Sequence, residues 1–189
     1  MALLRAALSR RLLFIGAGLA LLTTGPAAAQ TKRASVTDVQ AVFLFNFAQF
    51  VDWPPEAFSD PQAPLVIGIL GQDPFGSFLD ETVRGESVRG RPFLIRRYRR
   101  LEEIKDCHVL FISRSETNRL AEIIAALKDR PILTVSNGDD FARSGGIIRF
   151  ILDKSKIRLS IDLEAAQVAR LTFSSKLLRS AQIVPPTSR

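Results

Sequence analysis

The sequence predicts an α/β fold: a single-domain sandwich with a mostly parallel sheet, an antiparallel C-terminal hairpin and helices on both faces. Two patterns indicate this class. Apolar runs too short for helices alternate with segments of helical spacing, which is typical of strands in a parallel sheet. Near the C-terminus, apolar and polar residues alternate over 157–163, as expected for a hairpin strand with one face in the core.

The first 29 residues have the pattern of a secretory signal. Arg5, Arg10 and Arg11 precede an apolar stretch over 12–22, and small residues at 27–29 form a cleavage site. Cleavage before Gln30 leaves one domain over 30–189, which is long enough to bury a core. It also removes three arginines, so the formal charge falls from +7 to +4. An uncleaved anchor is the alternative, although the apolar stretch is short for a bilayer.

The next segment, VQAVFLFNFAQFVDWP at 39–54, predicts an aromatic-rich helix. We expect Thr37 to cap its start, with Gln40 completing a capping box. Pro54 and Pro55 end it, because a residue before proline is disfavoured in the helical conformation.

Helical spacing places an apolar face on one side of this helix and a narrow polar strip on the other. Asn46 falls within the apolar face, where we expect a hydrogen-bonded amide shielded from water. Phe45 falls on the polar strip. Either this is a buried core helix, or Phe45 and its neighbours contact another protein chain. The predicted apolar face comprises Val39, Val42, Phe43, Phe47, Phe50 and Val51, with Ala41, Leu44 and Ala48 covering much of the rest.

A buried strand over 65–70 is followed by a turn into a helix at 71–76. Asp73 is a suitable N-cap, and Pro74 suits the first helical position. Free backbone N–H groups in such a turn can hold an anion, but the spacing matches neither the dinucleotide fingerprint nor the P-loop. A plain strand-to-helix turn is therefore the competing interpretation.

Further apolar runs predict the remaining elements. Arginines flank the strand over 93–95, which indicates a solvated basic edge or a surface for acidic protein or anionic lipid. Export argues against nucleic acid as the partner. The other predicted strands are 109–112, 132–135, 147–152 and 157–163, and the predicted helices begin at 113–116, 136–140 (short, with Phe141), 164 and 174.

Neither Cys107 nor His108 indicates catalysis. The chain has one cysteine, so no intramolecular disulfide can form, and we expect Cys107 to be a buried, reduced thiol. Neighbouring side chains on a strand point to opposite faces, so the two residues cannot form a nucleophile–base pair. We expect His108 to be a hydrogen-bonded structural residue, and the sequence indicates no metal site, cofactor or enzymatic activity.

Five segments together carry a resemblance to a known family: AVFLFNFAQFVDWP at 41–54, LVIGILGQDPFG at 65–76, CHVLFIS at 107–113, LTVSNGDDFARSGGII at 133–148 and LTFSSKLLRSA at 171–181. In these segments the chain resembles the YfiR family of small exported proteins.

This resemblance implies a periplasmic α/β domain, often dimeric, without known catalytic activity. It also implies a role: the best understood member represses a membrane-bound diguanylate cyclase by binding its periplasmic domain. Cys107 matches a family cysteine, but Gly68 stands where some members supply a partner cysteine.

We therefore predict a periplasmic regulatory protein that contacts the periplasmic domain of a membrane signalling protein. Homodimerisation is expected; nucleic-acid binding and stable membrane insertion are not. The predicted partner-binding residues are Phe45, Leu163, Leu171 and Phe173. The alternative is a small-molecule sensor whose ligand lies where parallel strands end, near Asn46, Gly71, Asp73 and Ser136.

Overall fold

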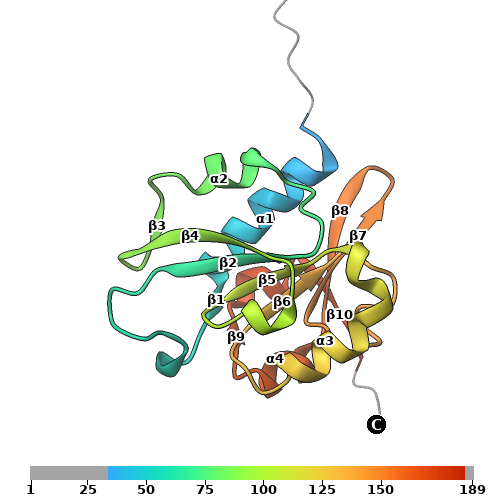
Figure 1. The fold of residues 1–189 in the computed structure, drawn as a ribbon. Helices are drawn as coiled ribbons and strands as arrows, with labels where there is room; N and C mark the ends of the chain where they lie inside the picture. The colour runs from blue at the N-terminus through green and yellow to red at the C-terminus, as the bar shows by residue number, and fades with distance from the viewer. Residues whose placement is uncertain (1–33, 186–189) are drawn as a thin grey trace, which may run out of the picture. The chain divides into compact units, whose positions relative to one another are not determined.

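The computed structural model describes residues 34–185, which form an eight-stranded sheet, a two-stranded sheet and five α-helices (Figure 1). The large sheet has the strand order β10-β8-β7-β6-β5-β2-β4-β3. The predicted signal segment at 1–29 lies outside the described residues. The strands of the large sheet are β2 (Leu65–Leu70), β3 (Ser87–Val88), β4 (Arg91–Tyr98), β5 (Val109–Ile112), β6 (Leu133–Ser136), β7 (Ile148–Asp153), β8 (Lys156–Ile161) and β10 (Ala181–Ile183).

The pairing within this sheet confirms the predicted fold class. The five central strands, β4, β2, β5, β6 and β7, are mutually parallel, and β7 and β8 form the antiparallel hairpin. Two short strands that the sequence analysis missed, β3 and β10, complete the edges. The helices are α1 (Val36–Phe50), α2 (Ser77–Val83), α3 (Leu120–Leu127), α4 (Leu163–Val168) and α5 (Ser175–Leu178).

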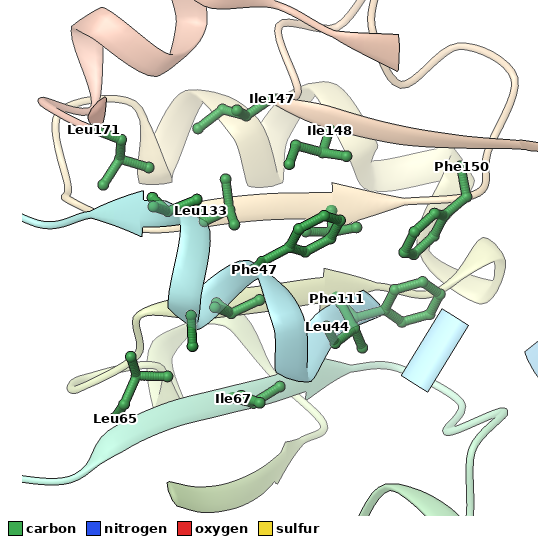
Figure 2. Packing of buried hydrophobic residues seen from close by; sticks show 14 of the residues in the cluster. Leu44, Phe47, Leu65, Ile67, Phe111, Leu133, Ile147, Ile148, Phe150 and Leu171 are labelled. Carbon is green, nitrogen blue, oxygen red and sulfur yellow. The ribbon is translucent and has the colours of Figure 1, made fainter. Parts of the chain in front are cut away.

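Alternate side chains of the buried strands point to opposite faces of the sheet, so both faces are apolar. Helices cover both of them. On one face, Leu44 and Phe47 of α1 pack with Ile67, Phe111 and Phe150 (Figure 2). On the other face, α3 packs over a second cluster formed by the intervening strand residues. That cluster includes Leu70, Leu110, Ile112, Ile123, Leu127 and Phe141.

The ends of α1 differ from the sequence prediction. Ser35, not Thr37, is the N-cap, and the capping box is completed by Asp38 rather than Gln40. The helix ends at Phe50 instead of continuing to Trp53. Residues 51–52 are extended as β1 (Val51–Asp52), which pairs with β9 (Thr172–Phe173). This antiparallel pairing satisfies the backbone N–H and C=O groups that a longer helix would have bonded internally. No local sequence pattern indicated it.

The buried face of α1 also differs from the prediction. Ala41, Leu44 and Ala48 are buried together with Phe47, whereas Val39 and Val42 are exposed by 37% and 40%. Asn46 is only half-buried, and its side chain has no hydrogen bond within residues 34–185. The prediction of a shielded, bonded amide was therefore wrong. A helix that is apolar on nearly all sides has no pattern that decides which side meets the sheet.

Three further local predictions were wrong. Asp73 does not cap α2: Gly76 is its N-cap, and Asp73 instead accepts a hydrogen bond from the Phe75 N–H (2.7 Å). After Ser136 the chain forms turns rather than a short helix, and Phe141 is fully buried from a turn. We also expected the helix that begins at 174 to continue to 181, but α5 ends at Leu178, and residues 181–183 form β10 beside β8.

Substitutions on α1 test its orientation. We expect Leu44→Ala to lower the free energy of unfolding by about 2–5 kcal/mol, because it leaves a cavity in the core. Val42→Ala, the matched control two residues earlier, should change it by less than about 0.5 kcal/mol. Urea unfolding measures both, and equal losses for the two variants would contradict the orientation described here.

Candidate functional site

The predicted ligand site lies where β2 and β5 end, and side chains of the protein itself fill it. Gly71 follows β2 with a positive φ of 86°. A Cβ atom at Gly71 would lie 2.6 Å from Glu116 Oε1. The neighbouring Gln72 N–H donates to Ser115 Oγ at 3.0 Å. The segment after β5 therefore closes over the segment after β2, in the crevice where open α/β sheets usually bind ligands.

The other residues predicted for this ligand site are engaged or lie elsewhere. Asp73 accepts from the Phe75 N–H and from Arg97 Nε (2.7 Å). The buried Ser136 hydroxyl donates to the Ile112 carbonyl at 2.8 Å and accepts from the Gly138 N–H at 3.1 Å. Asn46 is on α1. None of these residues lines a cavity described below, so ligand binding by this set stays a prediction.

The predicted partner-binding residues are spread over several elements and pack against the core. Phe45 is half-buried, with its ring 5.1 Å from that of Phe93. Leu163 and Phe173 are also half-buried, in α4 and β9. Leu171 is only 4% exposed and presents almost no surface to another chain. A role of this set in partner binding also stays a prediction.

Sequence reasoning missed an exposed apolar surface, which we term the α1–hairpin surface: Val36, Val39, Val42, Leu152 and Ile157. Val36, Val39 and Ile157 border a groove of about 400 Å³. Leu152 pairs with Ile157 across the hairpin and is 59% exposed. The sequence signal was the run of valines spaced three apart; the prediction placed Val39 and Val42 on the buried face of the helix and began the helix after Val36.

His108 is a structural residue at the start of β5. Its Nδ1 accepts a hydrogen bond from the Val66 N–H at 3.0 Å, so the ring proton is on Nε2. Nε2 then donates to the Ala57 carbonyl at 3.0 Å. The imidazole thus connects β2 to the loop after β1, and both of its nitrogens are occupied. This geometry leaves no nitrogen available for acid–base chemistry.

An aromatic stack surrounds this imidazole. Phe58 stacks on it with ring centres 4.3 Å apart, and the Arg91 guanidinium lies 3.8 Å from the Phe58 ring centre. Trp53 Nε1 donates to the His108 carbonyl at 3.1 Å. Arg91 also donates to the carbonyls of Asp60 and Ala63. Together these contacts hold the loop over 53–63 against the sheet.

Burial lowers the pKa of His108 to about 4, partly opposed by the hydrogen bond to Ala57. The charged ring would lose the bond from Val66, since Nδ1 would then carry a proton. The neutral form is therefore the stable one in the folded protein at neutral pH.

Cys107 is buried and free, as predicted. Its thiol donates to the Val109 carbonyl at 3.3 Å, and burial raises the pKa of the thiol to about 12. A Cβ atom at Gly68 would lie 2.8 Å from Cys107 Sγ and 2.6 Å from the Tyr98 ring. Gly68 thus lies next to the thiol, at the position where some family members have a cysteine. Glycine has no sulfur to form a disulfide, and the Tyr98 ring occupies the space beside it.

Within residues 34–185, no cluster of three or more His, Cys, Asp or Glu side chains could hold a metal ion. None of the helices in the same range has the length and apolar character that crossing a membrane requires.

A family model described as YfiR/HmsC-like matches residues 37–182. The chain belongs to this family. The match covers α1 through most of β10, so the elements described above are those of the family's domain. A search of curated proteins found no match.

Among solved structures, the chain is similar to a crystal structure of a conserved domain protein from Vibrio cholerae O1 biovar El Tor. The two share 12% sequence identity with a TM-score of 0.53. The alignment covers 80% of this chain but 60% of the other, so this protein corresponds to only part of that structure. At this identity the likeness concerns the fold alone.

The depressed pKa of His108 predicts a pH-dependent stability. The unfolded chain binds a proton on His108 below about pH 6.5, whereas the folded chain does so only near pH 4. Stability should therefore be fully present above pH 6.5 and decrease as the pH falls to 4, by about 3 kcal/mol. Urea unfolding measures the free energy of unfolding across this range. In the non-titrating His108→Gln variant, the loss that comes from protonation of His108 should be absent. An identical pH dependence in both proteins would contradict it.

Burial of Cys107 predicts slow chemical modification. A thiol reagent should label the native protein at least about a hundredfold more slowly than the urea-unfolded chain, because little thiolate forms and access is blocked. Mass spectrometry over time measures both rates. Rapid labelling of the folded protein, or a covalent dimer on a non-reducing gel, would show that the thiol is accessible.

Proposed function

We propose that this protein is a periplasmic regulatory binding protein. It represses a membrane-bound diguanylate cyclase, or a similar signalling protein, by contacting that protein's periplasmic domain. Membership of the YfiR/HmsC-like family supports this role, since the resemblance implies periplasmic regulators without catalytic activity. The structural observation that carries the proposal is the exposed α1–hairpin surface.

This surface has the properties of a contact region. Exposed valines follow one side of α1, and the hairpin residues Leu152 and Ile157 continue the apolar area beside them. Apolar side chains that gather on a surface usually mark a protein interface, because covering them removes apolar area from water. Lys156 borders the groove and supplies a positive charge at its edge.

Repression requires that this contact discriminate between states of the partner. A protein that binds the active and inactive forms of a cyclase equally tightly does not change the equilibrium between them, however strong the binding. The α1–hairpin surface must therefore meet apolar groups that only the inactive form of the periplasmic domain exposes. A second copy of this chain is the other occupant that we propose, since the resemblance implies homodimers.

Charge substitution on the surface tests the role. Val39→Asp and Leu152→Asp should each weaken association with the periplasmic domain of the candidate cyclase at least tenfold, because the partner would have to bury an unpaired carboxylate. Gln49→Asp, at an exposed position near the C-terminal end of α1 and outside the α1–hairpin surface, is the control and should leave association unchanged. Analytical ultracentrifugation of the 30–189 chain, alone and in mixtures, measures both partner binding and self-association.

Phe45→Asp belongs in the same series. Its ring packs on Phe93, so the substitution should lower stability as well as any association through Phe45. If all folded variants associate as the unmodified protein does, the α1–hairpin surface is not the contact region. If the unmodified protein binds no membrane protein from its source, the regulatory role is wrong. A small-molecule sensor is then the remaining candidate, which the cavity described next favours.

A further inference from the structure

A cavity of about 350 Å³ lies between α3 and α4, which are neighbours in Figure 1. This volume falls within the range of small-ligand sites. Most of its wall is apolar and comes from both helices and from the segments that lead into β6 and β7. The apolar lining includes Ile124, Ala125, Ile132, Ile147, Ala165 and Val168.

Two buried polar side chains also line this cavity, and both have unused hydrogen-bonding capacity. Asp162 is 7% exposed, and its only side-chain bond within residues 34–185 is from the Ala165 N–H to Oδ1 at 2.9 Å. Thr134 is 5% exposed and accepts from the Ile147 N–H at 3.1 Å. Its hydroxyl proton has no acceptor among the described residues. Asp162 Oδ2 and the Thr134 hydroxyl proton are therefore available to a ligand placed in the cavity.

The charges around the cavity favour a cation. Asp162 and Glu164 contribute two carboxylates, and Lys128 contributes one ammonium group. None of the three forms an ion pair within the described part of the chain. Asp162 is the most deeply buried, so its carboxylate gains most from a positive group placed inside the cavity.

We propose that the cavity between α3 and α4 binds a small apolar amine. The ammonium group pairs with Asp162, and the hydrocarbon part lies against Ile124, Ile147 and Val168. This inference does not rest on the proposed regulation of a cyclase, because it concerns the isolated domain. None of the residues predicted from the sequence as ligand-binding takes part in it.

The cavity can be tested with three probes of similar size and different charge: 2-phenylethylamine, 2-phenylethanol and 3-phenylpropanoate. Titrations followed by ¹H–¹⁵N NMR of the 30–189 chain should show saturable shifts with the amine, centred on α3 and α4. The alcohol should bind at least tenfold more weakly, and the anion should not saturate at millimolar concentration.

Two variants and a matched control locate the binding. Asp162→Asn keeps an N-cap for α4 but removes the charge, so it should weaken amine binding at least tenfold and abolish the preference over the alcohol. Ala125→Leu fills the cavity from the exposed side of α3 and should abolish binding. Ala126→Leu, at an exposed position outside the cavity lining, should leave binding unchanged.

Several outcomes would overturn the proposal. These are no saturable binding of the amine, equal affinity for the amine and the alcohol, or unchanged amine binding in folded Asp162→Asn or Ala125→Leu. Unchanged binding in Asp162→Asn would mean that Asp162 acts only as the cap of α4. Because no membrane partner enters these titrations, their failure is distinguishable from failure of the proposed repression.

Discussion

The packing of α1 against the sheet is the interaction on which the rest of the structure depends. Leu44 and Phe47 fill the centre of the core between strands that are far apart in sequence, β2, β5 and β7 (Figure 2). Once this face is buried, the opposite face of α1 must be exposed. Val36, Val39 and Val42 therefore lie on the surface beside the hairpin. The same contact that stabilises the domain thus creates the apolar surface proposed for partner binding.

The end of α1 is held by a second set of contacts, centred on His108. The chain leaves the helix at Val51, pairs with β9, and then passes over the imidazole through Trp53, Ala57 and Phe58. Neutral His108 accepts from β2 and donates to the loop, which connects three segments through one ring. His108, a residue type that often acts in acid–base catalysis, therefore has a structural role here: it holds the loop after β1 against the sheet.

The location of the candidate sites follows from how the crevice at the strand ends is filled. Ser115 and Glu116 occupy the region beside Gly71, so the position that often binds ligands in α/β sheets is closed by the protein itself. The two sites that we propose for recognition lie in other parts of the molecule. The α1–hairpin surface is apolar and exposed, which suits another protein, whereas the α3–α4 cavity contains a buried carboxylate, which suits a small cation.

The sequence by itself determined the fold class, the parallel strands at β2, β5 and β6, the hairpin, and the buried state of Cys107, because apolar run length and alternation are local properties of the chain. Only the tertiary structure decided which side of α1 is buried, since that helix is apolar on almost every side. It also decided that α1 ends at Phe50 and that residues 181–183 form a strand, because both depend on pairing with distant segments. The cavity beside Asp162 could not be predicted for the same reason: its walls come from α3, α4, β6 and the connecting segments beside them, and no local sequence pattern indicates that these lie close together.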